Sequence, residues 1–184
     1  MKKAWIIVLA VLVLLGISAM SSYNNLVNLN ETVNGKWGQI DVQLQRRADL
    51  IPNLVATVKG YAAHEQSILN NLADARSRLV GAQGAADKAA ANEELNTTLS
   101  RLLVVVENYP NLKADANFRQ LQDDLSGTEN RIAVARKDYN DSVQIYNAKI
   151  KTFPNAIWAG MLGFSPREYF QAEAGSKTAP QVKF

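Results

Sequence analysis

The sequence is most regular in residues 116–153, ANFRQLQDDLSGTENRIAVARKDYNDSVQIYNAKIKTF. Apolar and small side chains recur there at steps of three and four, the spacing of one face of an α-helix. They are Phe118, Leu121, Leu125, Thr128, Ile132, Ala135 and Tyr139, followed after a slip of one residue by Val143, Tyr146, Ile150 and Phe153. A straight helix of 3.6 residues per turn slips in this way against a seven-residue repeat. The pattern predicts one long amphipathic helix.

Two further stretches carry single apolar stripes at helical spacing. The stripes are Leu26, Leu29, Val33, Trp37, Ile40 and Leu44, and Leu95, Leu99, Leu102, Val106 and Tyr109. Helix boundaries are indicated by prolines at positions 52, 110, 154, 166 and 180 and by the run GAQGAA at 81–86, with Asp87 as a candidate cap. We expect helices at residues 23–50, 52–80, 88–109 and 116–153. The predicted fold is all-α, an antiparallel up-and-down four-helix bundle preceded by an N-terminal transmembrane helix.

Pro52 leaves two interpretations. The apolar phase continues through it from Leu44 to Val58, as in one kinked helix. A single helix over residues 23–80 would rise about 90 Å, against about 33 and 57 Å for its two partners. A turn at Pro52 gives helices that can lie side by side along their lengths, so we expect a hairpin there.

The amino end predicts a membrane anchor over residues 1–22. Lys2 and Lys3 precede a stretch, residues 4–30, that has no charged side chain, and Trp5 and Tyr23 flank its most apolar part. The alternative is a signal peptide cleaved near Ala19, but the apolar run exceeds the usual length of such peptides. The basic flank predicts a single pass through the bacterial inner membrane, with the N-terminus cytoplasmic and the bundle on the extracytoplasmic side.

Composition excludes several classes of site. The 184 residues include no cysteine and one histidine, His64, which rules out thiol chemistry, di-iron sites and zinc sites of several histidines. His64-Glu65 begins like a zinc-protease motif, but Ile68 stands where the second histidine is required. Without Lys2 and Lys3, the 20 basic residues fall to 18, against 17 acidic ones, so we expect no nucleic-acid partner. No cofactor is predicted.

Several motifs together resemble the LemA family of bacterial membrane proteins. They are Tyr23-Asn24-x-Leu26-Val27, Trp37-x-Gln39-Ile40-Asp41-Val42-Gln43-Leu44, Arg46-Arg47-x-Asp49-Leu50-Ile51-Pro52-Asn53-Leu54-Val55, Val58-Lys59-Gly60-Tyr61-Ala62-x-His64-Glu65, Glu107-Asn108-Tyr109-Pro110-x-Leu112-Lys113-Ala114 and Thr128-Glu129-Asn130-Arg131-Ile132-Ala133-x-Ala135-Arg136. Tyr139-Asn140, Tyr146-Asn147 and Phe153-Pro154 extend the match. The resemblance implies an amino-terminal anchor and an antiparallel helical bundle, and it implies no reaction. Family members are linked with membrane proteolysis or envelope stress.

The carboxyl-terminal region, residues 154–184, contains two candidate contact surfaces. Residues 156–164 form an uncharged run too short to span a membrane, which makes Trp158, Met161, Leu162 and Phe164 candidates for contact with the membrane interface or a partner. The alternative is that this run folds over the open end of the bundle. Ser165-Pro166-Arg167-Glu168 forms a capping box that predicts a short helix to Ala174. The tail residues Val182 and Phe184 fit a PDZ-type groove, although packing against the bundle is the favoured alternative.

Polar residues form two further groups within the predicted bundle, residues 23–153. The first group lies at the expected distal turn and consists of Arg46, Arg47 and Asp49. It could form a docking site for a partner. Alternatively, Asp49 caps the second helix and the two arginines face the carbonyl end of the first helix. Polar side chains in the last helix must lie partly in the core, where hydrogen bonds would fix its register. They are Glu129, Asn130, Arg131, Asn140 and Asn147.

These features predict a membrane-anchored scaffold or adaptor rather than an enzyme. The sequence has no nucleophile–base pair, phosphate loop or ligand cluster, so an enzyme or metal-binding protein is the least favoured class. We expect contacts with membrane lipid and self-association to a homo-oligomer, which a shared membrane plane promotes through high local concentration. The alternative function is an accessory or substrate-presenting partner of a membrane protease or envelope stress system.

Overall fold

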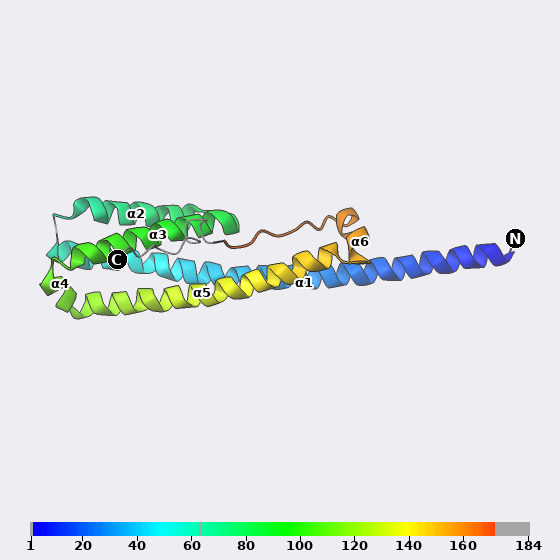
Figure 1. Ribbon diagram of the computed structural model, residues 1–184, viewed down its shortest axis with the longest axis horizontal. Helices are drawn as coiled ribbons and strands as arrows, with labels where there is room; N and C mark the ends of the chain where they lie inside the picture. The colour runs from blue at the N-terminus through cyan, green and yellow to red at the C-terminus, as the bar shows by residue number, and fades with distance from the viewer. Residues whose placement is uncertain (1, 63, 172–184) are drawn as a thin grey trace, which may run out of the picture. The chain divides into compact units, whose positions relative to one another are not determined.

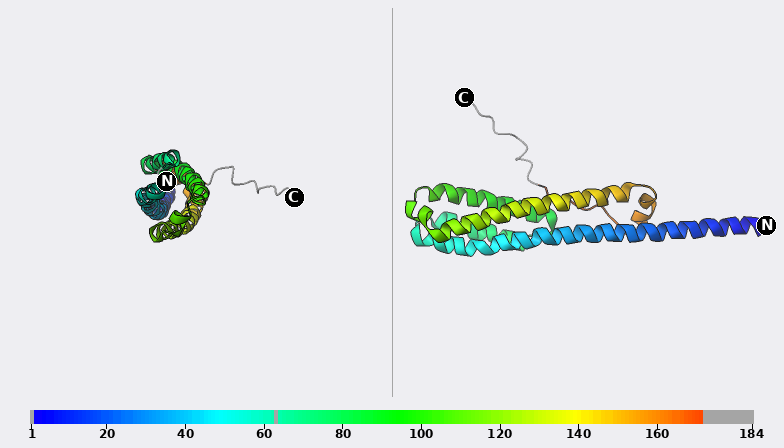
Figure 2. Two further views of the ribbon diagram at one scale, coloured as in Figure 1. Left: turned by 90° about the vertical axis from the view of Figure 1, so that its left-hand side faces the viewer. Right: turned by 90° about the horizontal axis from the view of Figure 1, so that it is seen from below.

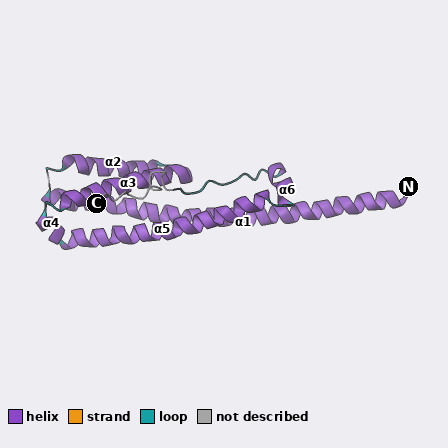
Figure 3. Cartoon of the chain, viewed as in Figure 1, coloured by secondary structure: helices purple, strands orange, loops and turns teal. Residues whose placement is uncertain are grey.

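The computed structural model describes residues 2–62 and 64–171, most of which are helical (Figure 1). The helices in these ranges are α1 (Lys2–Tyr61), α2 (Gln66–Gly81), α3 (Gly84–Val106), α4 (Pro110–Ala114), α5 (Ala116–Lys151) and α6 (Asn155–Met161). Figure 3 shows helices and loops but no strand over the residues described. The predicted all-α class is confirmed.

The chain divides into two compact units that share its two longest helices. Among the described residues, unit 1 contains residues 2–37 and 138–168, and unit 2 contains residues 38–62, 64–137 and 169–171. Unit 1 therefore holds the first part of α1, the last part of α5 and all of α6, whereas unit 2 holds the remaining parts of α1 and α5 with α2, α3 and α4.

Unit 2 contains four long helical segments, each of which buries apolar side chains. Residues 38–61 of α1, α2, α3 and residues 116–137 of α5 lie side by side (Figures 1 and 2). Their largest fully buried side chains are Ile40, Leu44, Ile51, Leu69, Leu72, Leu79, Leu95, Leu102 and Phe118. The stripe predicted in α5 is buried here at Leu125, Thr128, Ile132 and Ala135, so the helical phase inferred from the sequence is confirmed.

The hairpin predicted at Pro52 is wrong. Helix α1 continues to Tyr61, and the chain turns between Tyr61 and Gln66. Proline has no backbone N–H, so the carbonyl of Ala48 loses its normal helical donor. Arg76 of α2 replaces that donor, because its Nε donates to the Ala48 oxygen at 2.8 Å. A neighbouring helix thus satisfies the carbonyl that proline leaves unbonded, and the helix continues.

The break predicted at residues 81–86 is confirmed, with a different cap from the expected one. Helix α2 ends at Gly81, and α3 begins at Gly84, where the positive φ of 75° favours glycine. Asp87 lies in the first turn of α3 rather than at its cap, so the capping prediction is wrong. Pro110 occupies the first turn of α4, a position compatible with its missing N–H.

Unit 1 has its own buried side chains. They are Leu26, Val33, Tyr139, Val143, Tyr146, Ile150 and Ala159. The rings of Trp37 and Tyr139 pack with centroids 5.5 Å apart, and Lys36 Nζ lies 2.9 Å from Asp138 Oδ2. Phe153, the last residue of the predicted stripe, is 82% exposed, so the stripe ends at Ile150.

The first part of α1 is apolar and exposed. Its most apolar window of 18 residues has a mean hydropathy of 2.5 and is not buried within the structure. By length and composition this helix can cross a membrane. Ile6, Leu14 and Met20 are each more than half exposed, as expected for side chains that face lipid.

Candidate functional site

Helix α6 follows Pro154 and ends in a glycine-dependent turn. Gly163 has a φ of 79°, a left-handed conformation that glycine adopts without steric cost. The N–H of Phe164 donates to the carbonyl of Ala159 at 2.9 Å, and that of Gly163 to Gly160 at 3.5 Å. These two bonds form a Schellman motif, which reverses the chain and fixes the position of Phe164.

Trp158 and Phe164 both contact α1 within unit 1. The indole Nε1 of Trp158 donates to Ser18 Oγ at 3.4 Å. The ring of Phe164 packs edge-on against Tyr23, with centroids 5.9 Å apart. Both α1 residues belong to the uncharged stretch that follows Lys3. The structure therefore places this part of the predicted contact region beside the end of the apolar segment.

The other side chains of this region form an exposed apolar surface, which we call the α6 surface. It comprises Phe153, Ile157, Met161 and Leu162, which are 82, 52, 76 and 39% exposed. Of the four residues predicted as contacts, Met161 and Leu162 belong to this surface, whereas Trp158 and Phe164 are half-buried against α1. Residues 152–166 contain no charged side chain.

The short helix predicted from Pro166 to Ala174 is wrong over residues 166–171, the part of it that the structure describes. Asn147 of α5 binds both backbone groups of Arg167, donating to its oxygen at 2.9 Å and accepting from its nitrogen at 2.8 Å. The Tyr139 hydroxyl donates to the carbonyl of Glu168 at 2.8 Å. A helix would have paired the carbonyl groups of Arg167 and Glu168 internally, whereas here both accept from side chains of α5, so tertiary contacts override the local signal.

Arg167 also ties this segment to α1. Its guanidinium donates to the side-chain oxygens of Asn30 and Asn34 at distances of 2.9–3.0 Å. Asn147 was expected to fix the register of the last helix, but its hydrogen bonds instead hold the extended segment at Arg167.

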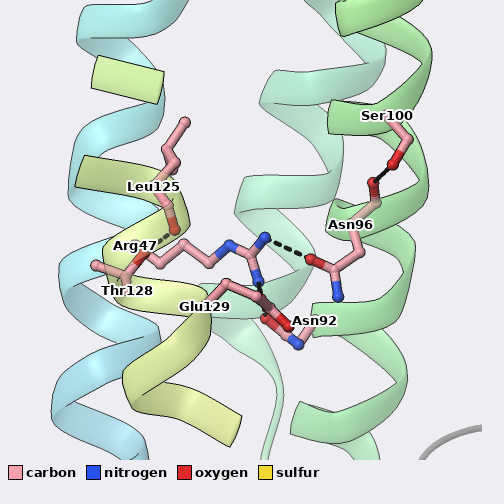
Figure 4. Close-up of polar contacts among 7 residues, drawn as sticks. All are labelled: Arg47, Asn92, Asn96, Ser100, Leu125, Thr128 and Glu129. Atoms are coloured by element: carbon pink, nitrogen blue, oxygen red, sulfur yellow. Dashed lines mark hydrogen bonds and ion pairs between the residues drawn. The ribbon is translucent and has the colours of Figure 1, made fainter. Parts of the chain in front are cut away.

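A buried polar cluster in unit 2 is centred on Arg47 (Figure 4). We call Arg47 of α1, Asn92 and Asn96 of α3 and Glu129 of α5 the arginine cluster. Arg47 Nη1 donates to Asn92 Oδ1 at 2.9 Å and to Glu129 Oε2, and Nη2 donates to Asn96 Oδ1. Arg47 is only 4% exposed. One guanidinium therefore links three helices.

The positions of the predicted distal-turn residues differ from expectation. Arg46, Arg47 and Asp49 lie within the continuous helix α1, so none of them is at a turn. Asp49 accepts a hydrogen bond from Gln45 one turn earlier at 2.8 Å and does not cap a helix. Arg46 is exposed. The capping interpretation is wrong and the residues are not at a turn, because the chain does not turn at Pro52; docking at these residues stays a prediction.

Burial and the neighbouring carboxylates have opposite effects on the pKa of Arg47. Burial lowers the pKa of its guanidinium, whereas the carboxylates of Glu129 and Glu93 raise it. The Nε atom of Arg47 is buried and has no hydrogen-bond partner among the described residues. The cluster thus offers one buried donor that its protein partners do not use.

A cavity of about 390 Å³ opens beside the arginine cluster. Its apolar lining comes from Leu54, Leu99, Leu102, Leu103, Phe118 and Leu125. Its polar lining comes from Arg47, Asn96, Ser100, Gln122, Ser126, Glu129 and Asn130. This volume lies within the range of pockets that bind small molecules.

Two tyrosine–carboxylate pairs connect the turns at one end of unit 2. Tyr61 donates to Asp115 Oδ2 at 2.9 Å, and Tyr109 donates to Glu65 Oε1 at 2.8 Å. These hydrogen bonds raise the pKa of both tyrosines. Asp115 also accepts from the N–H of Phe118, and this bond, followed by that from Tyr61, lowers the pKa of its carboxyl group.

The remaining predicted sites are less informative. His64 is exposed, and the described residues include no group of three or more side chains that could hold a metal ion. Val182 and Phe184 lie outside the described residues.

Comparison with known proteins agrees with the family resemblance. "Magnetosome protein MamQ 2" of Paramagnetospirillum magneticum is 30% identical over 182 residues, which cover 85% of this chain and 67% of that protein. "Magnetosome protein MamQ" of Magnetospirillum gryphiswaldense is 29% identical over 87% of this chain and 70% of its own length. "Protein LemA" of Metamycoplasma hominis is 25% identical over 81% of this chain and 68% of its own length. None of these names states an enzymatic activity. The LemA family model matches residues 36–184, and the chain belongs to the LemA family.

Proposed function

We propose that this protein is a scaffold of the bacterial envelope, anchored by the first part of α1 and acting through contacts with lipid and other proteins. Lys2 and Lys3 precede the apolar segment, and Lys36 is the first basic residue after it. This asymmetry supports a cytoplasmic amino end, with the rest of the chain outside the inner membrane. Membership of the LemA family supports association with a membrane.

The helical body of the proposed scaffold is an antiparallel four-helix bundle in unit 2. Support comes from the turns after Tyr61, Gly81 and Val106, which separate residues 38–61 of α1, α2, α3 and α5. Each segment contributes fully buried leucine, isoleucine or phenylalanine side chains. Single apolar stripes on four helices of this kind favour one shared core.

The α6 surface is the observation that carries the proposal. Trp158 binds Ser18, which lies within the uncharged stretch of α1, so α6 lies level with the end of the apolar segment. Helix α6 has seven residues and is about 10 Å long, far short of the roughly 30 Å needed to cross a bilayer. An uncharged, apolar and short helix at this level fits the interface between lipid headgroups and acyl chains.

The exposed side chains of this surface make lipid contact favourable. Fully burying a phenylalanine, isoleucine or methionine side chain contributes about 1.5–3 kcal/mol. Phe153, Ile157 and Met161 are each more than half exposed within the structure. Because no charged group lies between Lys151 and Arg167, insertion into the interface exposes no charge to lipid.

Photo-crosslinking in intact membranes tests the proposal. A photoreactive amino acid replaces Met161 in the full chain, and a matched control replaces Ile145, an exposed apolar residue of α5 in the same unit. We expect phospholipid adducts at position 161 and few at 145. Adducts between two copies of the chain at either position would support self-association. The proposal would be contradicted if the probe at position 161 formed adducts only within the same molecule and the control at position 145 gave the same result.

A further inference from the structure

We propose that residues 172–184 of this chain bind in the cavity beside the arginine cluster, with the side chains of Val182 and Phe184 against its apolar wall. The cavity is a groove open to solvent, and we refer to it as the groove. It lies within unit 2, as do Phe170 and Gln171, the last described residues before this segment. The binding is therefore independent of the lipid contact made by the α6 surface.

The groove has the surface that a peptide segment requires. Leu99 and Leu125 are buried in its apolar wall, and Leu103 is 41% exposed at the edge. Its polar lining includes the exposed side chains of Ser100, Gln122, Ser126 and Asn130. Their hydroxyl and amide groups can bond to the backbone N–H and carbonyl groups of an extended segment. An open groove admits such a segment from the side, whereas a small ligand would remain largely in water.

The chain approaches the groove in the required direction. Within unit 1, the backbone of Arg167 binds Asn147 and that of Glu168 binds Tyr139, so the chain runs towards the amino end of α5. Asn147 holds both backbone groups of Arg167, which shows how an amide side chain of α5 binds extended backbone. The part of α5 that lines the groove, between residues 118 and 130, lies further in the same direction along this helix.

Phe170 lies on the face of α5 that continues into the groove. It is 1% exposed, and its ring centroid is 5.9 Å from the guanidinium carbon of Arg136. Glu129 and Gln122, which both line the groove, precede Arg136 by two and four helical turns. All three side chains therefore project within about 40° of one another around the helix. The groove begins about 10 Å along α5 from the level of Phe170, the rise of two turns.

Length and attachment select this segment as the occupant. The distance along α5 from Arg136 to Phe118, at the far end of the groove, is about 27 Å. Residues 171–184 span up to about 46 Å when extended, so Val182 and Phe184 can reach the apolar wall without a fully extended path. A segment attached this close to its site is present at an effective concentration of about 1 mM or more. This concentration favours the segment over a separate partner of equal affinity.

The alternation of side chains in the segment fits a groove with one apolar wall. Val182 and Phe184 are two residues apart, so in an extended chain both project to the same side. Lys183 projects to the opposite side and remains in water. The two apolar side chains can then pack against the wall without burying the charge between them.

Photo-crosslinking of the full chain in lipid nanodiscs tests the proposal. Benzoylphenylalanine replaces Phe184 and retains an aromatic ring at that position. Mass spectrometry locates the adducts, and gel mobility separates single chains from crosslinked pairs. We expect adducts within one molecule, to the groove residues of α3 and α5. Adducts that join two copies at the groove would assign it to a second copy and overturn the proposal. Adducts with lipid alone, or no adducts at the groove, would also overturn it.

Two matched substitutions in α3 locate the contact. Leu103→Asp places a carboxylate on the apolar wall, where binding of the segment would remove it from water. This change should lower the yield of groove adducts about tenfold. Val104→Asp alters the neighbouring position, which is 72% exposed and does not line the groove, and should leave the yield unchanged. Equal yields in the two variants would overturn the site.

Methyl NMR of the chain without a crosslinker gives an independent measurement. Replacing both Val182 and Phe184 with serine should shift the methyl signals of Leu99, Leu103 and Leu125, because these side chains lose their apolar contacts. Lys183→Ser is the matched control and should leave the same signals unchanged. Signals that respond to neither change, or equally to both, would overturn the assignment of Val182 and Phe184 to the groove.

Discussion

The hydrogen bond from Arg76 to Ala48 predicts that the cost of losing Arg76 depends on Pro52. Arg76→Ala removes a charged donor from the carbonyl of Ala48, a residue with 0% exposure. A hydrogen bond to a charged group contributes about 1.5–3 kcal/mol, and an unsatisfied buried carbonyl carries a similar penalty. We expect Arg76→Ala to lower the free energy of unfolding by about 2 kcal/mol.

Pro52→Ala restores the backbone N–H that normally bonds to the carbonyl of Ala48. Arg76 is then no longer the only donor, so its removal should cost at most about 1 kcal/mol in this background. The coupling between the two positions is therefore about 1–2 kcal/mol, within the range observed for residues in direct contact. Pro52→Ala alone should stabilise the protein, because alanine is favoured over proline inside a helix.

Urea unfolding of the full chain in detergent micelles, followed by circular dichroism at 222 nm, measures all four free energies. Arg78→Ala is the matched control. Arg78 lies on the same helix and pairs with Glu94 at 2.6 Å, but its side chain is 64% exposed. Its loss should cost less than about 1 kcal/mol in either background. Equal costs of Arg76→Ala with and without Pro52 would refute the reasoning.

Three further predictions concern the polar contacts. Glu129→Ala should lower the free energy of unfolding by about 3–5 kcal/mol, because it leaves the buried Arg47 cation unpaired. Arg47→Met should lower it by less, because the Glu129 carboxylate left unpaired is 43% exposed. Urea unfolding compares the two variants, and the reverse order would contradict this account. The raised pKa of Tyr61 makes its contribution to stability complete below about pH 10 and lost as pH rises through the folded pKa. The lowered pKa of Asp115 makes its contribution complete above about pH 4 and lost as pH falls through the folded value. The decrease in the free energy of unfolding at alkaline pH should therefore be smaller in Tyr61→Phe, and the decrease at acid pH should be smaller in Asp115→Asn. Unchanged pH profiles would exclude these two groups as contributors to stability. Asn147→Leu should increase hydrogen exchange of the backbone amides at 167–168 while leaving those of α2 unchanged, and equal protection in both proteins would show that Asn147 does not hold this segment.

Periodicity predicted the buried faces of the helices well because burial follows the helical repeat. Leu26, Ile40, Leu95, Ile132 and Tyr146 were all placed correctly on an inward face. The same signal could not locate the first turn. Pro52 is tolerated inside α1 because Arg76, 24 positions later in the chain, donates a hydrogen bond to the carbonyl of Ala48. The apolar phase that continues through Pro52 was the correct signal, and the comparison of helix lengths misled.

The candidate sites were predicted less completely because they depend on contacts between distant segments. The uncharged run around Trp158 was visible in the sequence, and its contacts with α1 are present. The sequence does not predict the arginine cluster as a unit: it places Arg47 at a distal turn and Glu129 among the polar residues of the last helix. Nothing local indicates that they meet across 82 residues. A charged residue in phase with the buried stripe of α1 was the only available sign.

The position of the α6 surface relative to the bilayer is the central claim, and spin-label depth measurement tests it most directly. The chain has no cysteine, so Met161→Cys and the control Ile145→Cys each give one labelling position. In liposomes, we expect the label at 161 to respond more strongly to oxygen, which concentrates in lipid, than to a water-soluble nickel complex, and the label at 145 to show the reverse. Strong access of the nickel complex to both positions would contradict the account.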